Sequence, residues 1–157
     1  MLRNFGFVID NQLAGLAHPG FSGDLDGALA ELRAEGITAL VSLDEGGIAG
    51  EVARAQDLAY LHLPIDDFGA PTLRQADRFV SFVEEQLASG GQVAAHCQAG
   101  IGRTGTMLAA YLIAQGASVE EAVTQVKRRR AQSVESDSQL AFLNQYAEYC
   151  ATRTDDP

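Results

Sequence analysis

Short apolar runs alternate with longer amphipathic segments along most of this chain, and that alternation constrains its fold more than any other feature. The run 37–43 is apolar on both faces, as strands buried within parallel sheets are. The segment 24–35 places its leucines on one helical face and stops at Gly36. The pattern therefore predicts an α/β fold, with a central, mostly parallel sheet flanked by helices on both faces.

The remaining elements follow one another without a linker, an internal repeat or a low-complexity stretch. Further strands are expected at 7–9, 13–17, 59–63 and 92–96, and a helix is expected over 103–115. Capping boxes at 72–75, 118–121 and 136–139 mark three more helix starts. We therefore expect residues 1–157 to form one domain, which is an ordinary length of ~100–200 residues for a single domain.

The charge balance excludes several classes of partner. With 11 basic and 21 acidic residues, the net charge of −10 argues against nucleic acid and anionic membrane surfaces. The longest apolar run, 107–114, is far shorter than the ~20 residues that a membrane span needs. Asp10 interrupts the stretch where a signal peptide has its apolar core. We expect a soluble, cytoplasmic monomer with reduced thiols.

The loop after the expected strand 92–96 carries the strongest chemical signal. It reads His96-Cys97-Gln98-Ala99-Gly100-Ile101-Gly102-Arg103-Thr104-Gly105. Consecutive N–H groups in such a glycine-containing turn can form a nest that binds a tetrahedral oxyanion, and the next helix adds positive potential. A guanidinium can donate two parallel hydrogen bonds to phosphate oxygens. The loop therefore predicts a phosphate-binding cup made by Gln98, Ala99, Gly100, Ile101, Gly102 and Arg103.

Cys97 is expected at the bottom of this cup, where the helix N-terminus and Arg103 favour a thiolate nucleophile. We expect His96 to hold the loop by a hydrogen bond to its backbone, and Thr104 to donate its hydroxyl to the sulfur. The alternative is a structural cysteine beside a tight turn. The number of fixed identities at this spacing favours the catalytic interpretation. The second cysteine, Cys150, is expected in the core rather than as a redox partner of Cys97.

The loop resembles the signature of the cysteine-dependent protein tyrosine phosphatases. In size and in the order of its segments, the chain is similar to the small atypical dual-specificity phosphatases, and the likeness extends over nearly its whole length. The resemblance implies a central sheet flanked by helices and a phosphate loop (P-loop). It also implies hydrolysis through a phosphocysteine intermediate, with no metal or other cofactor.

A general acid is required to protonate the leaving group when the thiolate attacks. The candidates are Asp66 and Asp67, which follow the strand that ends near Pro64. The family carries its acid in the pattern Asp-x-Gly-x-Pro, which 67–71 matches, so we favour Asp67. The alternative for both is a solvated loop carboxylate. The chain has no tryptophan and lacks the Trp-Pro-Asp hinge of the larger tyrosine phosphatases, so wide loop closure is not expected.

Two other groups of polar residues have two interpretations each. Glu135 and Gln139 fall in a region that approaches the cup in related small phosphatases, so they would orient Arg103 or the attacking water. Alternatively, Gln139 completes a capping box with Ser136 and Glu135 is solvated. The basic run 127–130 is interpreted as cations that suit the dipole at a helix end, with substrate docking as the alternative.

These features predict a phosphatase for phosphorylated proteins or small phosphomonoesters, acting on phosphotyrosine and also on phosphoserine or phosphothreonine. Inositol phosphates, phospholipids and RNA 5′-phosphates are alternative substrates. The neutral side chains of Gln98, Ala99 and Ile101, together with the net charge of −10, disfavour such polyanions. A phosphate-binding module without hydrolysis is a further alternative, against which Cys97, Arg103 and an acid candidate argue together.

Overall fold

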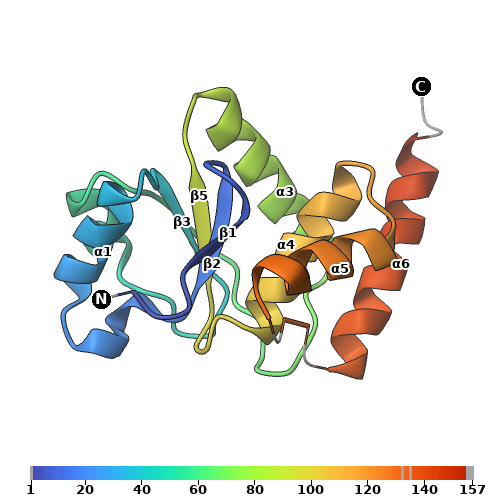
Figure 1. The fold of residues 1–157 in the computed structure, drawn as a ribbon, viewed down its shortest axis with the longest axis horizontal. Coiled ribbons are helices and arrows are strands. Elements are labelled where there is room, and N and C mark those ends of the chain that lie inside the picture. Colours follow the sequence, from blue (N-terminus) through green and yellow to red (C-terminus); the bar gives the residue numbers. More distant parts are fainter. Residues whose placement is uncertain (1, 132, 135, 155–157) are drawn as a thin grey trace.

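The computed structural model describes residues 2–131, 133–134 and 136–154. Within these ranges five strands form one sheet, in the order β1-β2-β5-β3-β4 (Figure 1). Only the β1–β2 pair is antiparallel, which confirms the predicted, mostly parallel sheet. The strands are β1 (Gly6–Ile9), β2 (Leu13–Leu16), β3 (Ala39–Ser42), β4 (Ala59–His62) and β5 (Val93–His96).

The helices begin close to where their capping signals predicted. They are α1 (Leu25–Ala34), α2 (Gly50–Ala55), α3 (Leu73–Ala88), α4 (Gly102–Ala114), α5 (Val119–Arg129) and α6 (Asp137–Thr154), with a 3₁₀ turn at Pro19–Ser22. Helix α2 was not predicted. It has no side-chain cap and buries only Ala53, so it leaves neither a capping signal nor an apolar period in the sequence. None of the described helices is both long and apolar enough to cross a bilayer.

Helices cover both faces of the sheet, as predicted. In Figure 1, α1 lies on one side of the strands, and α3, α4, α5 and α6 lie on the other. Successive strand residues point to opposite faces, so Ala14 and Ala94 pack toward α1 and α2. Leu13 and Val93 pack toward α3 to α6. Two apolar cores therefore hold the sheet between them.

The parallel register brings four loops to one edge of the sheet. Leu16 and Ser42, the last residues of β2 and β3, both pair with His96 at the end of β5, and Ser42 also pairs with His62 of β4. The loops that follow these strands therefore meet beyond their carboxyl ends, where α/β proteins bind ligands. This edge holds the predicted phosphate-binding loop.

Candidate active site

The loop between β5 and α4 is shaped by hydrogen bonds to the outside of its backbone. Four successive carbonyls accept hydrogen bonds from groups outside the loop. The Cys97 carbonyl accepts from His96 Nδ1 (3.0 Å), and the Gln98 carbonyl accepts from the His18 N–H (2.9 Å). Asn4 Nδ2 donates to the carbonyls of Ala99 (3.2 Å) and Gly100 (3.1 Å), and Arg130 Nη2 also donates to that of Gly100 (2.6 Å). In a planar trans peptide the N–H points opposite to the C=O. The N–H groups of the next residues therefore turn inward and line a cup.

Gly100 is the residue that lets the loop close. Its φ of +76° lies in the left-handed region, and a Cβ there would collide with the backbone carbonyl of Leu16. At Ile101, the N-cap of α4, no side chain caps the helix, so its first N–H groups stay available to an anion. The predicted nest and helix N-terminus thus occur together.

Cys97 is buried, and its sulfur accepts a hydrogen bond of 3.1 Å from Thr104 Oγ1. Thr104 lies in the first turn of α4 and is itself buried. A hydroxyl donor at this distance stabilises a thiolate more than a neutral thiol. The structure therefore brings Thr104 to the sulfur, as the sequence predicted.

His96 is completely buried and neutral. Because the Cys97 carbonyl can only accept, Nδ1 carries the proton, and Nε2 accepts from the Ser42 hydroxyl at 2.5 Å. Burial lowers the pKa of His96 to about 4, against the opposing effects of its bond to the Cys97 carbonyl and of nearby Asp44. The predicted bond from His96 to the loop is present, whereas its partner Ser42 was not foreseen.

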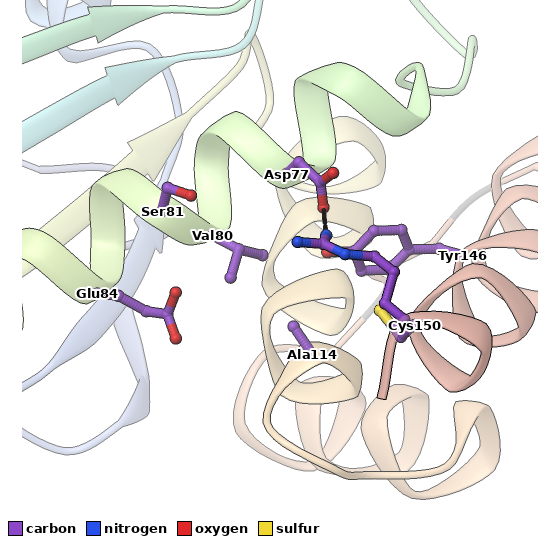
Figure 2. A pocket seen from close by; sticks show the side chains of 8 residues that line it. Asp77, Val80, Ser81, Glu84, Ala114, Tyr146 and Cys150 are labelled. Atoms are coloured by element: carbon purple, nitrogen blue, oxygen red, sulfur yellow. Dashed lines mark hydrogen bonds and ion pairs between the residues drawn. The ribbon is translucent and has the colours of Figure 1, made fainter. Parts of the chain in front are cut away.

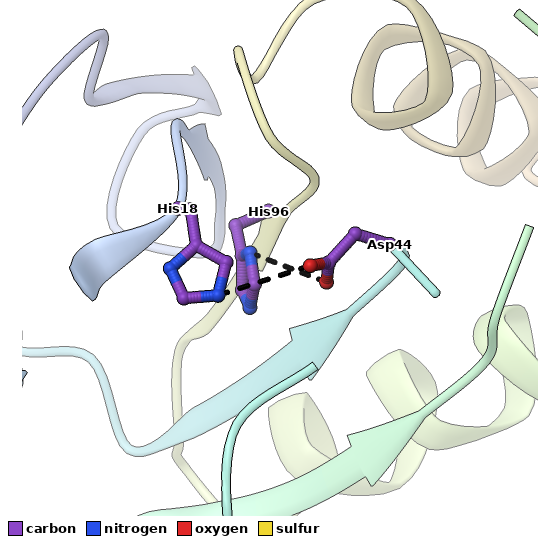
Figure 3. A group of neighbouring side chains, drawn as sticks. All are labelled: His18, Asp44 and His96. Atoms are coloured by element: carbon purple, nitrogen blue, oxygen red, sulfur yellow. Dashed lines mark ion pairs between the residues drawn. The ribbon is translucent and has the colours of Figure 1, made fainter. Parts of the chain in front are cut away.

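A buried carboxylate, Asp44, lies beneath the loop beside two imidazoles (Figure 3). Its oxygens lie 3.9 Å from His96 Nδ1 and 3.8 Å from His18 Nε2, and one oxygen accepts from Gln98 Nε2 at 3.3 Å. His18 Nδ1 accepts from the Gly20 N–H, so His18 Nε2 carries its proton. Both imidazole nitrogens facing Asp44 are therefore protonated, and this arrangement does not suit a metal ion, which needs their lone pairs.

Arg103 reaches from α4 to the opposite side of the cup. Its buried guanidinium forms an ion pair with Glu45, donates to the Ile65 carbonyl at 2.8 Å, and lies 3.4 Å from Asp67 Oδ1. The structure thus brings Asp67 and Arg103 together, whereas Asp66 has no side-chain contact with Arg103 among the described residues. Glu45 was not foreseen, although it follows β3 at the same sheet edge. Its own backbone hydrogen bond and then Arg103 lower the pKa of Glu45.

The loop that carries Asp67 is hydrogen-bonded to the start of α6. The Phe68 carbonyl accepts from the hydroxyls of Ser136 (3.0 Å) and Ser138 (3.2 Å). Gln139 completes the predicted capping box with Ser136, and its Nε2 donates to the Gly69 carbonyl at 3.2 Å. In the described part of the chain, Gln139 thus contacts this loop and not Arg103. The prediction for Glu135 lies outside the described residues.

A second hollow, of about 280 Å³, lies between α3, α4 and α6 (Figure 2). The Asp77 carboxylate there accepts from Tyr149 at 2.6 Å, Arg153 at 2.7 Å and Tyr146 at 3.4 Å. Cys150 lines this hollow, is half-buried against the core, and burial raises its pKa. No residue of the phosphate loop lines it, so Cys150 belongs to the packing of α6, as expected from the sequence.

Residues 14–117 match the family described as "Polymorphic toxin system, DSP-PTPase phosphatase". The chain belongs to this family. The match begins in β2 and runs through the loop that contains Cys97 and Arg103 to just beyond α4. The predicted resemblance to small dual-specificity phosphatases is therefore confirmed.

Individual proteins are also similar to this chain. An uncharacterized protein of Methanocaldococcus jannaschii is 34% identical over 87 residues, 55% of this chain and 58% of that protein, so the chain spans little more than half of it. The human protein tyrosine phosphatase type IVA 3 is 26% identical over 144 residues, 90% of this chain and 83% of that protein. The crystal structure of PTPMT1 superimposes with a TM-score of 0.87 at 25% identity, covering 98% of this chain and 99% of that one.

Proposed function

We propose that this protein hydrolyses phosphate monoesters on proteins, phosphotyrosine and also phosphoserine or phosphothreonine, through a phosphocysteine intermediate on Cys97. One observation carries the proposal: Cys97 lies at the floor of a cup of inward N–H groups, with Arg103 and Asp67 in contact at its mouth. Such a cup is a fixed set of donors for the oxygens of a phosphoryl group in transfer.

Each residue then has a defined chemical role. The N–H groups from Gln98 to Arg103 and the Arg103 guanidinium bind the phosphoryl oxygens. The Cys97 thiolate attacks phosphorus, the P–O bond to the leaving group breaks, and Asp67 in its acid form protonates the departing oxygen. Asp67 then takes a proton from a water molecule that attacks phosphorus. The S–P bond breaks, phosphate is released, and the Thr104 hydroxyl stabilises the departing thiolate.

The surroundings of the cup favour a phosphorylated protein as substrate. A groove of about 370 Å³ runs beside the loop. It holds one cation, Arg3, which lies over the half-exposed ring of Phe21 with its Cζ 5.6 Å from the ring centroid. A single cation and an aromatic surface suit the residues that flank a phosphorylated side chain. The net charge of −10 opposes polyanions. The groove is lined by Arg3, Asn4, Ala17, Phe21, Ala99, Ile101 and Ala131.

A phosphoinositide is the second candidate substrate, because PTPMT1, which shares this fold, has been solved in complex with PI(5)P. PI(5)P is also a phosphate monoester, so the same cup would serve it. For the chain as a whole we propose a single catalytic domain over residues 1–157 that acts as a cytoplasmic monomer. We propose neither a nucleic-acid nor a membrane partner, and no cofactor.

The decisive experiment compares kcat/KM for p-nitrophenyl phosphate, phosphotyrosine and phosphoserine peptides, and PI(5)P, with the Cys97→Ser protein as the blank. We expect turnover of phosphopeptides in excess EDTA, a ³²P label trapped on Cys97 by rapid denaturation during turnover, and a loss of at least about 10⁴-fold in Cys97→Ser. Appreciable turnover by Cys97→Ser would show that the nucleophile is another group. A kcat/KM for PI(5)P above that for every peptide would establish the second candidate.

A further inference from the structure

Arg130 is a buried guanidinium on the outer side of the phosphate loop. It caps the C-terminus of α5 and is only 4% exposed, whereas the preceding cations, Lys127, Arg128 and Arg129, lie at the surface. The run lies at a helix end, as expected, but its last member is not at the surface. Arg130 has turned inward, because its guanidinium finds a set of backbone carbonyls beneath the loop.

The partners of Arg130 are unusual for a buried cation. Among the described residues no carboxylate pairs with it, and its Nε has no hydrogen-bond partner. A buried charge without a counter-ion is costly, so such a group is expected to face a negative charge. Its acceptors are four carbonyl oxygens, of Asn4 (2.7 Å), Gly6 (3.4 Å), Gly15 (2.7 Å) and Gly100 (2.6 Å).

Arg130 and Cys97 are connected through Gly15 and Thr104. A Cβ on Gly15 would lie 2.9 Å from Arg130 Cζ and 2.8 Å from Thr104 Cγ2, so only Gly15 separates these two side chains. Thr104 in turn donates to Cys97 Sγ. Burial lowers the pKa of Arg130, and the charge of Cys97 is the one group that acts in the opposite direction. The geometry thus places a fixed cation behind the sulfur.

We propose that Arg130 is a positioning residue of the phosphate loop and the buried counter-charge of the Cys97 thiolate. Its bond to the Gly100 carbonyl keeps that oxygen outside, so the N–H of Ile101 stays directed into the cup. Its positive charge offsets the negative charge that the thiolate and a bound phosphate bring to a nearly closed site. The proposal rests on the proposed function for the identity of the nucleophile and of the anion.

Other charged and titratable groups face the cup from each neighbouring element, and none of those among the described residues places a second fixed positive charge behind the loop. Neutral His96 and the pair of Asp44 and His18 lie beneath the loop. Arg103, with Glu45 and Asp67, lies at the mouth. Because a guanidinium stays protonated at all working pH values, Arg130 adds no titration step of its own.

The test measures two properties that need no turnover: the pH profile of Cys97 alkylation by iodoacetamide, and the binding of inorganic phosphate. The variants are Arg130→Met, Arg130→Lys and, as a matched control on the exposed side of α5, Arg128→Met. In Arg130→Met we expect the midpoint of the alkylation profile to rise by about one pH unit, a tenfold loss of thiolate at a fixed pH. In Arg130→Lys the midpoint should stay near that of the wild type, since the charge remains.

Phosphate binding should weaken by about tenfold in both Arg130 variants, because one ammonium group cannot hold all these carbonyls in place of the planar guanidinium. Arg128→Met should match the wild type in both properties. A folded Arg130→Met protein with an unchanged midpoint would overturn the proposal. Where Arg130→Met does not fold, unchanged phosphate affinity in folded Arg130→Lys would overturn it equally. A wild-type protein that binds phosphate but fails to turn over any ester would refute the proposed function alone.

Discussion

The two buried arginines on either side of the phosphate loop form a natural comparison. Arg103 and Arg130 are almost equally enclosed, at 3% and 4% exposure. At the mouth, Arg103 faces Glu45 and Asp67, whose side chains are 58% and 60% exposed. Behind the loop, Arg130 binds only backbone carbonyls among the described residues. The same type of side chain therefore has exposed, charged partners at the mouth and neutral backbone partners behind the loop.

This difference suits Arg103 to binding a phosphate and Arg130 to positioning the loop. Ion pairs with exposed carboxylates contribute little to stability, so Arg103 can exchange a carboxylate for a phosphate oxygen at small cost. The carbonyls of Gly6 and Gly15 have no such freedom, because these residues belong to strands that are paired in the sheet. Changes at the mouth should therefore alter catalysis with little loss of stability, and changes behind the loop should alter stability or loop geometry.

The largest expected effect at the mouth comes from Asp67→Asn, which removes the proposed acid. For phenyl phosphate, a substrate with a poor leaving group, kcat should fall by about 10²-fold, and for p-nitrophenyl phosphate by only a few-fold. The matched variant Asp66→Asn should change both values by less than about twofold. Equal losses in the two variants would show that the register of the acid is wrong. Thermal unfolding should be similar in both.

His96, behind the loop, should make stability depend on pH. Its pKa in the folded protein is about 4, below the ordinary value of 6.5. Between these values the unfolded chain binds a proton that the folded protein does not, so the free energy of unfolding falls as the pH falls. The slope from this group is at most about 1.4 kcal/mol per pH unit. Urea unfolding of the wild type and of His96→Asn between pH 7 and 4.5 should show this slope only in the wild type, and parallel curves would contradict the assignment.

The smallest expected effect is that of Glu45→Gln. The amide keeps an acceptor for Arg103 but removes the charge that orients the guanidinium, so we expect kcat/KM for p-nitrophenyl phosphate to fall by about threefold to tenfold. The free energy of unfolding at pH 7 should hardly change. Glu121→Gln is a suitable control, because Glu121 is an exposed carboxylate in the capping box of α5 and its pKa is also lowered by hydrogen bonds. Equal kinetics for the two variants would remove Glu45 from the mouth of the site.

The features that could be predicted from the sequence are those encoded by a few consecutive residues. The mostly parallel sheet, three capping boxes and the loop from His96 to Thr104 could all be predicted, because periodicity, capping and glycine spacing are short-range properties. Asp67 was placed by a five-residue pattern next to a strand end. Helix α2 was missed because six residues without a cap carry no comparable signal.

The residues that could not be predicted are distant in sequence from the loop residues that they contact. Asn4 is 95 positions from Ala99, Ser42 is 54 from His96, and Glu45 is 58 from Arg103. Their proximity depends on strand order, since β2 and β3 flank β5 although β3 and β5 are separated by β4 in sequence. No spacing in the chain reveals that order.

The amino-acid sequence by itself determined the class of fold and marked the candidate anion-binding loop and its candidate nucleophile, because each depends on neighbouring residues. Only the tertiary structure decided which groups surround that loop: a neutral His96 held by Ser42, an Arg103 shared by Glu45 and Asp67, and an Arg130 turned away from its own basic run. The reason is that burial and charge pairing are set by the residues that packing brings together from distant parts of the chain.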